Sequence, residues 1–261
     1  MKDTLKIYWM AFNTALQAKF EYRVDFLIGV ATALLRQTSS LVLLFVVYHK
    51  TAELNGWTQD QATLLFGMSA AALGFSELFF NHIWMVPGYV ITGDLDRLLT
   101  YPVNSLFFLL ITRPELHSFG NLTMGFILAS ISLHHSNAPW YAWVLVPFLM
   151  LLGCVIYTGA LVIMTSISFK FIGPSSMHLM IPNTMLQATG YPLSIYPGAI
   201  QVFFMFLLPY GAFQFLPASL FFQKGIDPWL LALAPLAVVF FLWNVNKAWQ
   251  WGIDQYESTG S

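Results

Sequence analysis

Charged residues are scarce in this chain, and their scarcity excludes most classes of soluble protein. Lysine, arginine, aspartate and glutamate make up 9% of the 261 residues, whereas hydrophobic residues make up 57% and aromatic residues 17%. Ordinary soluble domains carry roughly 25% charged residues. The formal net charge of -1 also removes any bulk electrostatic attraction to nucleic acid. The composition therefore predicts an all-α integral membrane protein that does not bind nucleic acid.

Residue patterns for covalent, metal or nucleotide chemistry are equally sparse. Cys154 is the single cysteine and lies inside an apolar run, which excludes an internal disulfide framework and a cysteine-based metal site. The six histidines form no HExxH pattern, and the sequence contains neither a GxSxG motif nor a GxxxxGK[ST] phosphate-binding loop. We therefore expect no catalytic residue, metal or cofactor in this chain, and no nucleotide hydrolysis by this polypeptide alone.

Long apolar runs predict six transmembrane helices in a single membrane domain covering residues 1–261. About 20 consecutive apolar residues suffice to cross a bilayer. The predicted spans are residues 24–48, 62–86, 117–133, 141–169, 198–222 and 229–245. Residues 1–22 are predicted to form an amphipathic helix in the membrane interface, and residues 171–196 are also predicted to be interfacial. Pro209 and Pro217 break the fifth span.

The basic residues predict the orientation of these spans. Cytoplasmic loops carry an excess of lysine and arginine. With both termini in the cytoplasm, Lys50 and Lys224 are the external basic residues. The cytoplasmic ones are then Lys2, Lys6, Lys19, Arg23, Arg97, Arg113, Lys170 and Lys247. The chain is thus expected to be a multi-pass protein of the bacterial plasma membrane.

A polar interruption at residues 88–116 separates the second and third spans and contains a predicted short helix. Asp94 can cap this helix, and Leu95, Leu98 and Leu99 then fall on one face. The remaining polar side chains of the helix, Asp96 and Arg97, lie off that face, and Tyr101-Pro102 ends it. Such a helix, tied at both ends to membrane spans, is suited to docking on a soluble partner. The alternative is a solvated loop that lies on the lipid headgroups.

Two charged residues are predicted to lie at membrane depth. Arg36 is in the middle of the first span, and Glu77 lies at a similar depth in the second, with Asn81 and Trp84 on the same helical face. Buried charges in membranes pair with each other or line a pathway. One interpretation is a structural ion pair between Arg36 and Glu77. The other is a path for a cationic or amphipathic substrate beside aromatic rings such as Phe80.

Two stretches of the sequence resemble the ABC-2 type transporter permeases, in the subgroup whose permease genes are often paired. The first is GDLDRLLTYPVN, in which the matching residues are Gly93, Leu95, Asp96, Leu99, Pro102 and Asn104. The second begins at YPLSIYP and matches at Tyr191, Pro192, Ile195, Tyr196, Pro197, Pro209, Phe213, Pro217 and Ala218. Both stretches occur in the expected order, and the resemblance covers essentially the whole chain.

The resemblance implies the permease subunit of an ATP-driven exporter for a lipophilic or amphipathic substrate. Two cytoplasmic ATPase subunits would bind ATP and Mg²⁺ and dock on the helix at 94–99, and the segment around Pro209 and Pro217 would form a re-entrant element. Such permeases work as homodimers or as heterodimers with a sister permease. A non-transporting membrane scaffold and a lipid-modifying membrane protein are the alternative functions.

A heterodimer is the favoured assembly in the membrane. Two-fold symmetry would place an axis-facing Arg36 or Glu77 opposite its own copy, which is unfavourable for like charges. A non-identical sister permease avoids that repulsion, and a homodimer is the alternative. The small residues of the first span allow close helix approach within the chain or across a dimer interface; they are Gly29, Thr32, Ala33 and Ser40.

Overall fold

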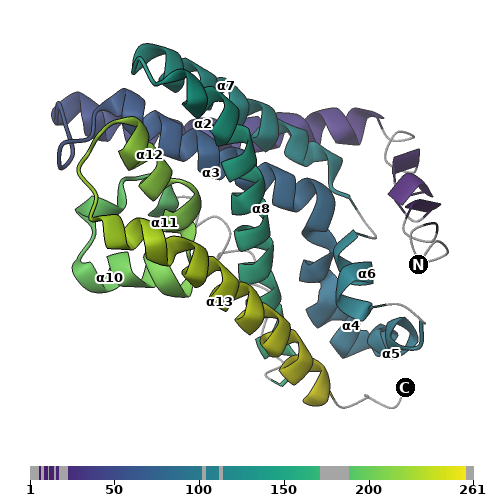
Figure 1. Cartoon of the computed structure of the whole chain (residues 1–261). Helices are drawn as coiled ribbons and strands as arrows, with labels where there is room; N and C mark the ends of the chain where they lie inside the picture. Colours follow the sequence, from purple (N-terminus) through teal and green to yellow (C-terminus); the bar gives the residue numbers. More distant parts are fainter. Residues whose placement is uncertain are drawn as a thin grey trace.

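Helices account for the regular structure throughout the described part of the computed structural model (Figure 1). The structure describes residues 23–101, 104–111, 114–170 and 188–256, together with residues 6, 9, 10, 12–14, 16 and 17. Within these ranges the β pairing is a single isolated bridge between Leu54 and Trp57. The predicted all-α membrane class is confirmed. Most of the two predicted interfacial segments, 1–22 and 171–196, lies outside the described residues.

Five helices in the described part of the chain are long and apolar enough to cross a membrane. They are α2 (Arg23–Lys50), α3 (Gln59–Phe80), α7 (Phe119–His135), α8 (Trp140–Ser168) and α13 (Pro228–Asp254). The helices α2, α7 and α8 agree with the predicted spans to within a few residues. The helix α13 begins where predicted but continues nine residues past the predicted end at residue 245. A short 3-10 helix, η2 (Leu116–Ser118), leads into α7.

The second predicted span, 62–86, ends earlier than predicted. Phe80 leaves the helical region with φ -130° and ψ 17°, and the chain continues as the 3-10 helix η1 (Asn81–Met85). The helix α4 (Val86–Thr92) then begins with Pro87 in its first turn. Proline has no backbone N–H to continue the α-helical ladder, which explains a new helix start at this point.

Small residues hold α3 and α7 in backbone contact. A Cβ atom built on Gly125 of α7 would lie 2.4 Å from the amide nitrogen of Ala71 in α3 and 2.7 Å from the carbonyl oxygen of Gly67. A Cβ on Gly74 would lie 2.7 Å from the amide nitrogen of Leu122. Small residues permit this close approach between membrane helices. With α2 and α8 also packed against it, α3 is the centre of the fold.

The small-residue face predicted for the first span is used within the chain. A Cβ on Gly29 of α2 would lie 2.7 Å from the Cβ of His117, and a Cβ on Gly120 of α7 would lie 3.1 Å from that of Ala33. Thr32 from the same predicted face is exposed and donates to the Ile28 carbonyl oxygen at 2.8 Å. Gly29 and Ala33 therefore join α2 to η2 and α7.

A sixth apolar segment is a bent pair of helices. Its first arm is α10 (Gly198–Val202) with the π-helical turn η4 (Phe203–Leu207); its second arm is α11 (Tyr210–Phe213) with α12 (Phe215–Phe221). The arms meet at an angle of 74°. Pro209 lies at the break and caps α11, whereas Pro217 lies in the first turn of α12, where a missing N–H is tolerated.

Both ends of this bent pair contact the same loop, residues 51–58. Asn55 Nδ2 donates to the carbonyl oxygen of Ser194 at 2.7 Å, just before the first arm. Lys224 Nζ, just after the second arm, donates to the carbonyl oxygen of Gly56 and lies 5.7 Å from the Trp57 ring centroid. The two ends of the segment therefore lie on one side of the molecule, beside the same loop, and the predicted re-entrant element stays a prediction. We call residues 198–221 the hairpin.

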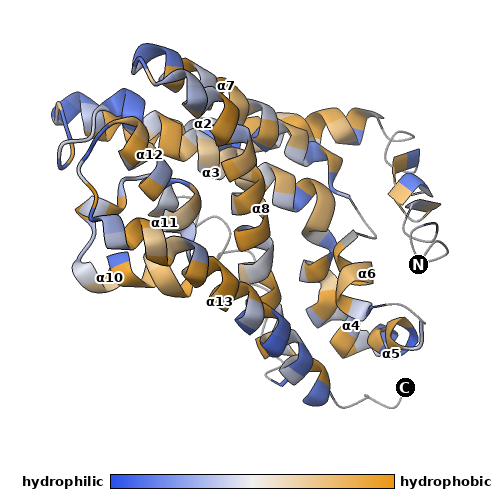
Figure 2. Ribbon diagram, viewed as in Figure 1, coloured by the Kyte–Doolittle hydropathy of each residue, from blue (hydrophilic) through white to orange (hydrophobic). Residues whose placement is uncertain are grey.

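The opposite end of the molecule carries three short helices: α4, α5 (Asp94–Leu99) and α6 (Ser105–Ile111). Figure 1 shows the C-terminal end of α13 approaching α5, far from loop 51–58 and the hairpin. In Figure 2 hydrophilic residues gather at the loop near residues 51–58 and along the last turns of α13, while hydrophobic residues dominate the helices between them. We refer to the α5 end as the inner end.

Candidate functional site

The helix predicted after Asp94 exists, but its start differs from the prediction. Gly93 is the cap, with φ 76°, and Asp94 is the first helical residue. Asp94 instead accepts a hydrogen bond from Thr92 Oγ1 at 2.7 Å. A left-handed φ favours glycine because it has no Cβ. Gly93 thus makes the sharp turn from α4 into α5.

The leucine face of α5 points into the protein. Leu95 is fully buried, and Leu98 and Leu99 pack partly buried against the same hydrophobic core. Asp96 and Arg97 are exposed instead. The burial of these leucines stabilises this chain, and the coupling of residues 94–99 to an ATPase stays a prediction. The surface that α5 leaves for a partner is its polar face.

The end of α5 and the start of α6 contain the last residues of the stretch GDLDRLLTYPVN. The α5 helix ends at Leu99, and Pro102 lies outside the described residues. Asn104 Oδ1 accepts a hydrogen bond from the backbone N–H of Phe107 at 2.9 Å, which satisfies a free donor in the first turn of α6. The Tyr101 ring lies 5.4 Å from that of Phe108. Asn104 therefore has a local structural role that the sequence analysis did not assign.

Tyr256 connects α5 to the inner ends of α8 and α13. Its ring lies 6.2 Å from that of Phe169, which in turn lies 5.4 Å from Trp249 of α13. Burial, and then the neighbouring Asp96 carboxylate of α5, raise the pKa of the Tyr256 phenol. A Cβ on Gly252 would lie 2.7 Å from the Phe169 ring, so α8 and α13 touch closely here. A displacement of α5 would therefore act on both helices.

Arg36 and Glu77 lie next to each other in the structure. The Arg36 guanidinium is 3.7 Å from Glu77 Oε1, and Asn121 Nδ2 of α7 donates to Glu77 Oε2 at 2.6 Å. The Glu77 side chain is 17% exposed, whereas that of Arg36 is 43% exposed. Both carboxylate oxygens of Glu77 therefore have partners within the chain. The sequence analysis missed Asn121, which carries no charge to mark it.

The aromatic residues predicted to accompany Glu77 lie in two different helices. Phe80 is half-buried and its ring lies 6.3 Å from that of Phe79. Trp84 is exposed and lies in η1, beyond the end of α3, so the α-helical spacing that placed it on the face of Glu77 does not hold there. The side chain of Asn81 lies outside the described ones. Phe80 therefore belongs to a cluster of rings on α3 while Trp84 lies outside that helix, and the substrate path beside Glu77 stays a prediction.

A buried polar network holds the hairpin to the helix bundle. Gln214, at the junction of α11 and α12, is fully buried, and its side-chain oxygen accepts a hydrogen bond from Ser69 of α3. Its Nε2 donates to the carbonyl oxygen of Thr189 at 2.8 Å, and the Thr189 hydroxyl lies 3.0 Å from that of Tyr157 in α8. These bonds satisfy polar groups that the hydrocarbon core could not.

Replacing Gln214 with leucine is expected to loosen the hairpin. The substitution removes the hydrogen bonds of Gln214 to the Ser69 hydroxyl and to the Thr189 carbonyl, which should lower the free energy of unfolding by about 2–3 kcal/mol. Thermal unfolding of the purified protein in detergent measures it. The matched control is Gln201→Leu, which removes a single bond to the Tyr196 carbonyl at a half-buried site and should lower it by less than about 1 kcal/mol. Equal melting temperatures for the two variants would contradict the role of Gln214.

The described residues contain no group of three or more metal-binding side chains, and Cys154 is buried. The features assembled so far define a polytopic helical membrane subunit with a short helix at its inner end and the bent hairpin at the other. A family model of the ABC-2 family transporter proteins matches residues 34–260, and the chain belongs to this family. It is thus a permease subunit of an ABC transporter, a class that associates with ABC ATPase subunits. Comparisons with curated proteins and with solved structures found no significant match.

Proposed function

We propose that this permease exports a lipophilic or amphipathic substrate, such as a drug-like cation or a lipid-linked molecule. Two cytoplasmic ABC ATPase subunits supply the energy and bind ATP and Mg²⁺. The chain lies in the bacterial plasma membrane with both termini in the cytoplasm, an orientation that the basic residues favour. The observation that carries the proposal is the position of α5, whose polar face is exposed while its leucine face is anchored in the core.

This arrangement supports a coupling role for α5. Leu95 packs α5 against the hydrophobic core. Tyr256 lies between Asp96 of α5 and the ends of α8 and α13. An ATPase that binds the exposed Asp96 and Arg97 side would therefore move helix ends rather than a free loop. Rigid, well-packed elements transmit such displacements because cores are not continuously deformable.

The contacts of Glu77 support a structural role for this residue more than a substrate-binding role. Its two carboxylate oxygens already interact with Arg36 and Asn121, so a cationic substrate would have to displace an existing partner. The substrate is instead expected to contact apolar and aromatic side chains. Chemistry of this kind suits lipophilic and amphipathic molecules, which have little charge to solvate.

A heterodimer with a non-identical permease remains the favoured assembly. The Arg36 side chain is 43% exposed on the single chain, and a guanidinium at membrane depth requires protein or water rather than lipid beside it. A second permease that offers an acceptor would cover it, whereas a symmetric copy facing it would bring a second Arg36. Native mass spectrometry of the solubilised complex tests this. Two copies of this chain without another permease, in an active assembly, would favour the homodimer.

The docking role of α5 is tested by reversing the charge of Arg97. Arg97→Glu should leave the permease folded, because the side chain is exposed, and should weaken its association with the ATPase about ten-fold. Co-purification and stimulation of ATP hydrolysis report the effect. Lys50→Glu is the control, since Lys50 is exposed at the opposite end of the molecule and makes the same charge change away from α5. Wild-type association of the Arg97 variant would remove α5 from the docking surface.

A further inference from the structure

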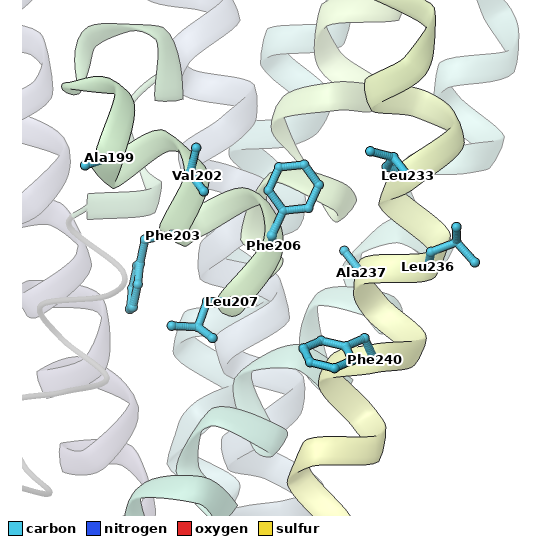
Figure 3. A pocket seen from close by; sticks show the side chains of 9 residues that line it. All are labelled: Ala199, Val202, Phe203, Phe206, Leu207, Leu233, Leu236, Ala237 and Phe240. Atoms are coloured by element: carbon cyan, nitrogen blue, oxygen red, sulfur yellow. The ribbon is translucent and has the colours of Figure 1, made fainter.

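An apolar groove runs along α13 beside the hairpin. One cavity of about 520 Å³ lies between the first arm of the hairpin and the outer half of α13. Figure 3 shows Phe206 on the hairpin side and Leu233, Ala237 and Phe240 on the α13 side. A second cavity of about 570 Å³ continues toward the inner end between η4, α8 and α13. Because Phe203, Leu207 and Phe240 line both cavities, the two form one continuous groove.

The inner end of the groove carries its polar groups. Lys247 and Asn244 line the second cavity together with Trp251, and none of the described residues that line the two cavities is a carboxylate. The Lys247 Nζ lies 5.8 Å from the ring centroid of Trp243, which holds the cation near the groove mouth. Lysine and tryptophan at one level are typical of the boundary between hydrocarbon and headgroups. The groove is therefore apolar along its length and positive at one end.

We propose that this groove binds an anionic phospholipid of the inner leaflet, with its phosphate at Lys247 and an acyl chain along α13. The helix rises about 21 Å from Leu233 to Lys247, because the two residues are 14 positions apart and each position adds about 1.5 Å. One leaflet contributes about 15 Å of hydrocarbon, so a single acyl chain lies entirely within the groove. The positive end matches the negative charge of such a headgroup.

The charge of the groove favours a lipid over a second copy of this chain. A two-fold partner seated here would bring its own Lys247 toward the first, and no described carboxylate in the groove would compensate. The bound lipid would contact η4, α8 and α13 together. The lipid would thereby stabilise the hairpin in the resting transporter. It would be a structural ligand, distinct from the exported substrate.

The test is lipid retention by the full-length permease in its purified complex. Native mass spectrometry after exchange into defined mixtures compares phosphatidylglycerol with phosphatidylcholine. The wild type should retain the anionic lipid about five-fold better, and Lys247→Gln should abolish this preference. Leu207→Trp, at an exposed residue that lines both cavities, should reduce retention of both lipids by obstructing the chain.

Lys50→Gln is the matched control, because Lys50 is exposed at the opposite end of the molecule. It should retain the wild-type preference. Equal retention of both lipids by the wild type, or an unchanged preference in Lys247→Gln, would overturn the proposal. So would a lipid-free dimer of this chain that Leu207→Trp dissociates, since a second copy would then occupy the groove. None of these outcomes bears on ATPase docking, which Arg97→Glu tests separately.

Discussion

Gly125→Ala is expected to destabilise the protein by about 3 kcal/mol or more. The new Cβ would lie 2.4 Å from the amide nitrogen of Ala71 and 2.7 Å from the carbonyl oxygen of Gly67. Both atoms belong to the backbone of α3, so no side chain can rotate away and the two helices must separate. Overpacking typically costs about 1–3 kcal/mol, and a clash with backbone lies at the upper end. Thermal unfolding in detergent, together with the yield of folded protein, measures the loss.

Gly88→Ala provides the matched control for this substitution. Gly88 lies in α4, is exposed, and has no heavy atom within 4 Å of an added Cβ. The same one-methyl change there should be neutral or should stabilise the protein by about 0.4–1 kcal/mol, because alanine reduces the entropy of the unfolded chain. If Gly125→Ala unfolds at the wild-type temperature, α3 and α7 are not in backbone contact.

The second large effect is expected from separating Arg36 and Glu77. Arg36→Leu removes the arginine that neutralises the Glu77 carboxylate, and Glu77→Leu removes the carboxylate that both Arg36 and the Asn121 amide contact. Each single change should lower the free energy of unfolding by about 2–3 kcal/mol, somewhat less than for a fully buried pair because Arg36 is partly exposed. The double variant should be more stable than either single variant.

A double-mutant cycle measured by thermal unfolding gives the interaction energy directly. We expect a favourable coupling of about 3 kcal/mol between the two side chains, because the double variant can be more stable than each single variant only if the coupling exceeds the loss caused by one substitution. Additive effects would show that the two charges do not stabilise each other. If Glu77→Gln keeps wild-type stability but abolishes export of cations alone, Glu77 acts on the substrate path instead.

The sequence alone determined the membrane class and the place of most helices. Hydrophobic length is a local property, and the bilayer demands about 20 apolar residues wherever a helix crosses. The low charge content made Arg36 and Glu77 conspicuous, because a charge at membrane depth needs a partner. The motifs around Gly93 and Tyr191 were sufficient to indicate the permease family that the family model confirms.

Tertiary structure alone decided which way the leucines of α5 point. Periodicity places Leu95, Leu98 and Leu99 on one face, but a stripe of leucines suits a partner protein and the chain's own core equally well. The hairpin was similarly undecided, because Pro209 marks a break and not the direction of the chain after it. Contacts with the distant residues Asn55 and Gly56 settled that direction.

The groove and the buried amides also depended on tertiary contacts. Gln214 and Asn121 are uncharged and belong to no periodic sequence pattern. Their roles are evident only in the folded chain, where Ser69 lies beside Gln214 and Glu77 lies beside Asn121. In the sequence, Lys247 lies just after the predicted end of the sixth span. The groove that it lines exists because the hairpin packs beside α13. The hydrophobic effect is non-directional, so the sequence alone shows which segments leave water for the membrane. Hydrogen bonds and close packing require particular neighbours, which only the folded chain supplies.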